Sequence, residues 1–324
     1  MRPTSSTTIS RPDLGALAYE YDANALSLGF IAGQILPTFD VVEQTGEYPI
    51  IPIEAMLKLP KNTKRAPRTE YSRTDWEFET DYYSCQDHGF EEPLDDVEAR
   101  MYRRLFDGET VSVQRAMQVI MRVREKRVAD KLLSTTYVPA HGNAAGGNWS
   151  TLASCVPNTD VAAVMLSHYY TYGVRLTKAA MSDILFNYIW HSAAFRTANQ
   201  YVLNIDNSPK EIRRQMVANF LGLDEVLVGN ELYDSALKKK AFSLAGIWSA
   251  TKLLLFAGAL PGDLDLKKPV LGRTFLWTGD SPDILTVEQY REEKIRSEVY
   301  RVRHTVDEKL IFPYAGYIMT VAGL

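Results

Sequence analysis

Four carboxylates stand at alternate positions in one short stretch of the sequence, "TEYSRTDWEFETDYYSC", residues 69–85. If this stretch is a strand, Asp75, Glu77, Glu79 and Asp81 share one face, because strand side chains alternate with a period of two. Together with a histidine, these oxygens could form the site of a metal-dependent enzyme. Calcium sites, however, gather their ligands from a tight loop, whereas neighbours on one strand face lie about 6–7 Å apart. The metal hypothesis therefore stays an alternative, which requires the carboxylates to close around a pocket.

The same stretch is also typical of a contact surface. Trp76, Phe78 and Tyr82 lie on the opposite face of the predicted strand. The preceding residues 58–68, "KLPKNTKRAPR", contain five basic residues and no acid. An acidic strip that faces this basic run, in the same ribbon or on another subunit, is the simpler account. An isolated two-stranded ribbon is only marginally stable, so it needs a surface to lie on. We predict a subunit interface made by the charged and aromatic residues of this ribbon: Lys58, Lys61, Lys64, Arg65, Arg68, Asp75, Trp76, Glu77, Phe78, Glu79, Asp81 and Tyr82.

The remaining sequence has no signature of catalysis or of cofactor binding. The five histidines include no HxxxH pair, and none sits beside a cysteine in a ligand pattern. The chain has no GxSxG elbow, no phosphate loop ending in Gly-Lys-Ser/Thr and no GxGxxG. We therefore predict no catalytic residue, no cofactor and no metal ion.

The composition is that of an ordinary globular protein. The chain has 324 residues, of which 46% are hydrophobic and 23% charged, so it can bury a sizeable core. The net charge of −4 does not favour nucleic acid or an acidic membrane as a partner. The two cysteines form no CxxC pair, which fits a reducing compartment. The most apolar early segment, residues 23–36, is too short to span a bilayer.

Extended segments come first along the chain, followed by helices. Residues 14–42 are apolar without a clean period, which predicts an arm with one helical turn, and residues 45–83 predict a long hairpin broken by prolines. Residues 94–106 and 109–134 predict two helices, the second about 40 Å long. Its core-facing side chains are Val113, Met117, Ile120, Met121, Val128 and Leu132. The basic residues Arg115, Arg122, Arg124, Lys126, Arg127 and Lys131 cover much of the remaining surface, which we interpret as solvated and not as a nucleic-acid face.

The second half of the chain alternates helices with short strands. Residues 139–151 predict a flexible Gly/Asn loop. In "SPKEIRRQMVANFLG", Ser208 is the predicted helix cap and Gly222 the stop, and a buried strand follows at 224–229. From residue 285 we expect a long exposed strand or a helix, and then a final strand in "LIFPYAGYIMTV".

The order of these segments resembles the major capsid protein of tailed phages, which has the Hong Kong 97-type fold. The resemblance lies in "ALSLGFIAGQILPTFDVVEQTGEYPIIPIEAML", in "KRAP", in the hinge "DYYSCQDHGFEEPLDD" and in the helix ending "REKRVADKLL". Later, "VRLTKAAMSDILFN", "GLDEVLVGNELYD" and "YREEKIRSEVYRVRHTVDEKLIFPYAGYIM" resemble the axial domain and the closing strands of that family.

The resemblance implies an α+β fold in five parts. These are an N-terminal arm at 1–42, an extended loop at 43–90, a peripheral domain with a spine helix at 91–135, an axial domain at 136–284, and return strands at 285–324. It also implies a structural function. The chain would be an icosahedral head-shell subunit that contacts copies of itself in pentamers and hexamers, and the shell would enclose double-stranded DNA without sequence-specific binding.

Further partners and a location follow from the same resemblance. Portal, scaffolding and decoration proteins are the other expected partners, and no membrane is involved. The expected location is the virion, assembled in the host cytoplasm. Two alternatives stay open, the metal-dependent enzyme and another phage structural protein such as a decoration or tail protein. The long helix argues against a tail tube, because tail tubes consist mostly of strands.

Overall fold

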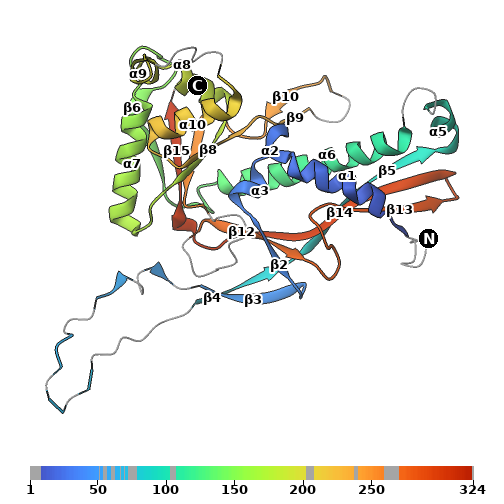
Figure 1. The fold of residues 1–324 in the computed structure, drawn as a ribbon, viewed down its shortest axis with the longest axis horizontal. Coiled ribbons are helices and arrows are strands. Elements are labelled where there is room, and N and C mark those ends of the chain that lie inside the picture. The colour runs from blue at the N-terminus through green and yellow to red at the C-terminus, as the bar shows by residue number, and fades with distance from the viewer. Residues whose placement is uncertain are drawn as a thin grey trace.

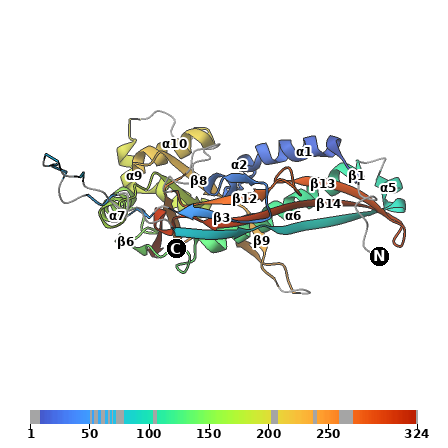
Figure 2. The same ribbon diagram turned by 90° about the horizontal axis from the view of Figure 1, so that it is seen from below.

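Two sheets lie side by side in a flat, elongated body (Figure 1, Figure 2). The computed structural model describes residues 9–50, 52–53, 57–59, 63–65, 67–68, 70–71, 79–102, 107–201, 208–236, 240–258 and 270–322. Within these ranges helices and strands mix in the α+β arrangement that the sequence predicts.

The first sheet is built around the 14-residue strand β14. Its order is β1-β13-β14-β12-β2, and β5 pairs with β14 outside this path. The strands are β1 Ile9–Ser10, β2 Thr38–Val41, β5 Gln86–Asp95, β12 Gly272–Trp277, β13 Thr286–Glu292 and β14 Ser297–Leu310. The region after residue 285 is therefore a hairpin of two strands and not a helix, and its long strand β14 is buried or half-buried where an exposed strand was expected. The "hinge" is also a strand, since β5 pairs with β14 from Gln86 onwards.

The spine helix α6, Gly108–Leu132, packs on one face of this sheet. Its first turn is capped by Asp107, which accepts a hydrogen bond from the Glu109 amide. All six side chains assigned to its core face are buried. The basic surface is only partly solvated, because Arg124 is 3% exposed. The short helix α5, Asp96–Tyr102, precedes it.

The second sheet carries its helices at one end of the molecule (Figure 1). Its order is β6-β15-β11-β7-β8. The strands are β6 His141–Asn148, β7 Lys178–Ser182, β8 Glu225–Gly229, β11 Lys252–Phe256 and β15 Gly316–Ala322, and the helices are α7 Pro157–Tyr172, α8 Asp183–His191, α9 Ala193–Ala198 and α10 Lys210–Leu221. The buried strand predicted at 224–229 is confirmed as β8.

Two details of this half differ from expectation. Residues 141–148 form a strand parallel to β15 and not a loop. Strand pairing uses backbone hydrogen bonds, which glycine can also make. Helix α10 begins one residue later than predicted, so Pro209 takes the cap position and the Ser208 carbonyl accepts from Arg213. Gly222 ends the helix with a φ of 72°, as predicted.

The N-terminal arm contains more helix than the single turn expected. It forms α1 Pro12–Ala23, α2 Ala25–Leu28 and α3 Ala32–Ile35. Pro12 suits the first turn of α1, and Gly29 ends α2 with a φ of 96°. Leu14 and Ala18 are buried in the same cluster as Met117 and Met121 of the spine helix. Packing against α6 therefore stabilises a helix whose own period is weak.

Two antiparallel ribbons complete the fold. The ribbon of β3, Thr45–Ile50, and β4, Glu79–Ser84, forms the base of the extended loop. The ribbon of β9, Leu232–Asp234, and β10, Leu244–Gly246, packs Tyr233 near Lys126 of the spine helix.

Candidate functional site

Aromatic side chains fix the base of the extended loop to the first sheet. Tyr83 of β4 stacks on Phe275 of β12 with ring centroids 4.7 Å apart, and Tyr48 of β3 lies 5.2 Å from the same ring. Gly46 lies opposite Tyr83, where a Cβ would come within 2.6 Å of the Tyr83 hydroxyl oxygen. The loop therefore starts from a platform that belongs to its own subunit.

One predicted interface carboxylate is used inside this platform. Asp81 accepts hydrogen bonds from the Tyr48 hydroxyl and from the Tyr82 amide, both at 2.8 Å. Burial would raise the pKa of Asp81, but these two donors lower it below its usual value. Asp81 shares its strand face with Tyr83, which faces the body. Asp81 therefore has partners within its own subunit, and its contact with another subunit stays a prediction.

The other predicted loop residues fall into two groups. Tyr82 is 60% exposed, and the exposed side chains of the loop also include Lys58, Lys64, Arg65, Arg68 and Glu79. The remaining five residues, Lys61, Asp75, Trp76, Glu77 and Phe78, lie outside the described residues. The four described basic residues of the run at 58–68 therefore lie at the surface.

The described residues give the metal hypothesis no positive support. Over the described ranges, no three histidine, cysteine or acidic side chains are grouped closely enough to hold a metal ion. Two of the four carboxylates, Asp75 and Glu77, lie outside those ranges. None of the helices that the structure describes has the length and apolar character needed to cross a membrane.

A buried carboxylate joins the arm, the spine helix and the second half of the chain. Glu125 of α6 is 1% exposed. It accepts hydrogen bonds from the amides of Ile31 and Ala32, at 3.0 and 2.9 Å, and from the Trp248 indole at 2.7 Å. Burial raises the pKa of Glu125, and the three N–H donors oppose this shift because they favour the charged form. We call this group the Glu125 clamp.

A second buried carboxylate ties the spine helix to β14. Glu308 is 4% exposed and accepts from Arg127 Nη2 at 2.7 Å, while the Glu308 carbonyl accepts from Lys131. Burial would raise the pKa of Glu308, but Arg127, Arg124 and Lys131 lower it below its usual value.

His304 lies beside this group and is fully buried. Its Nε2 lies 3.2 Å from Arg127 Nη2, and its ring centroid lies 5.8 Å from that of His88. Burial, together with Arg124, Arg127 and His88, lowers the pKa of His304 to about 2. His304 therefore stays neutral at physiological pH.

The sequence does contain a signal for these buried charges. The predicted core face runs from Val113 to Met121 in steps of three or four residues and then jumps seven residues to Val128. Arg124 and Glu125 occupy the gap, and both are buried. Charged residues at core-facing spacing therefore indicate buried polar contacts, although the sequence cannot name their partners.

Comparison with solved structures relates nearly the whole chain to a phage-related protein and to chains of capsid structures. A phage-related protein from Bordetella bronchiseptica RB50 matches with a TM-score of 0.71 at 18% identity, over 98% of each chain. A chain from the capsid structure of the cyanophage P-SCSP1u matches with a TM-score of 0.53 at 11% identity, over 90% of this chain and 88% of that one. The chain has the Hong Kong 97-type capsid fold.

The capsid fold is not restricted to phage heads. A chain of the holo-SrpI encapsulin complex from Synechococcus elongatus PCC 7942 matches with a TM-score of 0.50 at 10% identity, over 88% of this chain and 85% of that one. No model of a known protein family and no curated protein sequence matches the chain. The comparisons therefore show the fold, and the function must be argued from the molecule.

Proposed function

We propose that this chain is the major capsid protein of a tailed phage, which assembles into an icosahedral shell of pentamers and hexamers around double-stranded DNA. The observation that carries the proposal is a capsid fold over nearly the entire chain, together with the described residues between β3 and β4, which lie away from the body (Figure 1). We assign the chain no catalytic role.

The surface chemistry supports contacts with other copies. The base of the extended loop is fixed by Tyr83 and Tyr48, while the described basic residues beyond it are exposed. An exposed ion pair between two subunits contributes only about 0–1 kcal/mol to their association, but a shell repeats the same pair in every subunit. The net charge of −4 suits a container whose wall must not hold DNA tightly.

Partners and location follow from this function. The main partner is a second copy of the chain, and portal, scaffolding and decoration proteins are the further partners of a phage head. The virion, assembled in the host cytoplasm, is the location. Binding to DNA is not sequence-specific in this proposal.

Electron microscopy of the purified protein is the direct test. Closed shells or capsomer rings support the proposal, whereas monomers under all assembly conditions contradict it. If particles from the native source contain protein cargo in place of phage DNA, the protein forms an encapsulin-like compartment and not a phage head.

Reversing the charge of basic loop residues tests whether they form the contact between subunits. We expect Lys58→Glu combined with Arg68→Glu to leave the subunit folded and to reduce shell yield, increasingly at low salt. Lys210→Glu, an exposed reversal on α10, serves as the control. If the double variant assembles as well as this control, the basic run is not the contact.

A further inference from the structure

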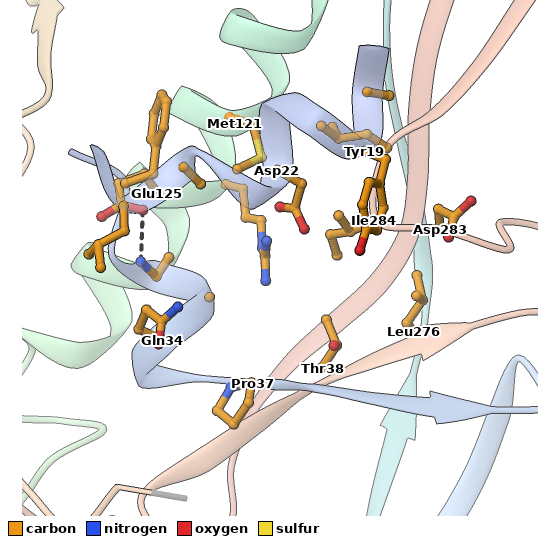
Figure 3. A pocket seen from close by; sticks show the side chains of 18 of the residues that line it. Tyr19, Asp22, Gln34, Pro37, Thr38, Met121, Glu125, Leu276, Asp283 and Ile284 are labelled. Carbon is orange, nitrogen blue, oxygen red and sulfur yellow. Dashed lines mark hydrogen bonds between the residues drawn. The ribbon is translucent and has the colours of Figure 1, made fainter. Parts of the chain in front are cut away.

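A cavity of about 450 Å³ lies between the arm and the spine helix. Its walls come from α1, α2, the segment from α3 to β2, the middle of α6 and residues 282–285. Figure 3 shows this arrangement, with Asp22 of α1 pointing into the cavity and Glu125 of α6 at its side. The Glu125 clamp holds one wall in place through the Ala32 amide.

Arg124 lines this cavity, where the charges of Glu308, Asp22 and Glu125 act on its guanidinium but the part of the chain that the structure describes leaves two of its nitrogens without a hydrogen bond. It is 3% exposed, and its Nε and Nη2 atoms have no hydrogen-bond partner among the described residues. The neighbouring Glu125 carboxylate, by contrast, accepts three hydrogen bonds. Buried polar groups in native proteins are nearly always paired, so two unpaired donor nitrogens at a cavity wall indicate a missing acceptor.

The charges around the cavity restrict what this acceptor can be. Asp22, Asp40 and Asp283 line the same cavity and are exposed. These acids repel any anion, and a polyanion such as a nucleic-acid backbone most strongly, so only a single negative charge placed beside Arg124 is attracted. The Nε–Nη2 edge of arginine is a two-donor fork that matches the two oxygens of a carboxylate.

We propose that this cavity binds one carboxylate group, which Arg124 receives through its guanidinium. The carboxylate comes from an acidic side chain of a second copy of the chain or from a free small carboxylate. The first source rests on the proposed function, and the second does not. Arg124 is then a binding residue whose partner arrives from outside the subunit.

The test compares wild type with Arg124→Met, Arg124→Lys and the exposed control Gln114→Met. Thermal unfolding of free subunits is measured in sodium acetate and in sodium chloride of equal ionic strength, and shell yield is then measured by microscopy. We expect Arg124→Met subunits to unfold at the same or a higher temperature than wild type, because the change removes an unpaired buried charge. Arg124→Gln is the second variant if Arg124→Met does not fold.

Two results support the proposal and identify the source. If acetate raises the unfolding temperature of wild type but not of Arg124→Met, the cavity takes a free carboxylate. If acetate has no effect but Arg124→Met loses at least tenfold in shell yield, with partial rescue by Arg124→Lys, the source is a second copy.

Two other results overturn it. A lower unfolding temperature of Arg124→Met in chloride means that Arg124 already has its partner inside the subunit. Normal assembly of Arg124→Met without any acetate effect means that no carboxylate binds. If wild type itself does not assemble, the proposed function is wrong. The comparison of unfolding temperatures in acetate and in chloride then tests the cavity proposal by itself.

Discussion

The Glu125 clamp gives the sharpest prediction for the stability of the subunit. Oε1 accepts from the Ile31 amide and the Trp248 indole, and Oε2 accepts from the Ala32 amide. In Glu125→Gln the amide oxygen can replace Oε1, but its NH2 group then faces the Ala32 amide, which leaves one donor unpaired. An unpaired buried donor costs about 1–3 kcal/mol, so we expect the free energy of unfolding to fall by that amount.

Glu125→Ala removes the acceptor for all three donors. Water that enters the space left by the side chain can satisfy some of them, so we expect a loss of about 3–5 kcal/mol, below the sum of three full penalties. Glu125→Ala also removes a negative charge that acts on the buried Arg124 guanidinium. Glu125→Ala should therefore be clearly more damaging than Glu125→Gln.

Urea denaturation of unassembled subunits measures these differences. Gln114→Ala, an exposed change on the same helix, should stay within about 0.5 kcal/mol of wild type. Hydrogen exchange at the Ile31 and Ala32 amides should accelerate in both Glu125 variants. If Glu125→Ala is as stable as the control, the clamp does not hold the arm and the reasoning is wrong.

Three further predictions concern the core, the loop base and pH. Ile120→Asp buries an unpaired charge at a cost of several kcal/mol and should abolish soluble subunits, whereas Lys126→Ala should cost less than about 1 kcal/mol; equal soluble yields would reject the assignment of the core face. Tyr83→Ala should cost about 3 kcal/mol and speed proteolysis within residues 45–85, while the exposed Tyr82→Ala should do neither; similar cleavage rates would show that Tyr83 does not fix the loop. Because burial lowers the pKa of His304 to about 2, the unfolded chain binds a proton below about pH 6.5 that the folded chain does not. The free energy of unfolding should therefore fall by about 1.4 kcal/mol per pH unit below pH 6.5, and His304→Phe should reduce this slope; an unchanged slope in urea titrations refutes the assignment.

The features that the sequence predicted well are those set by local pattern. The apolar period of 109–134 identified the buried side of the spine helix, and Gly222 marked the end of α10 because few other residues adopt its backbone conformation readily. The fold followed from the order of segments and not from any single motif. These features depend on residues close together in the chain, which a single sequence displays directly.

The features that it missed depend on partners distant in sequence. Residues 141–148 look like a loop until β15, almost 180 residues later, supplies a strand to pair with. Asp81 looks like one of four equivalent surface acids until Tyr48 and Tyr82 engage it. Nothing local distinguishes such residues from their neighbours, because the contact exists only once the distant segment is in place.

Arg124 and Glu125 are two charged residues at buried positions of the spine helix, and they bear on the proposed assembly. Replacing a buried ionic group by apolar residues is often neutral or stabilising, so two charges in the core face of the spine helix do not follow from stability alone. Glu125 is explained within the subunit, since three donors from two distant segments converge on it. Arg124 is not explained there, because the described residues leave its Nε and Nη2 unpaired. In the proposed shell, an acidic side chain of a second copy would complete the Arg124 site only on assembly, whereas a free carboxylate would complete it in the isolated subunit.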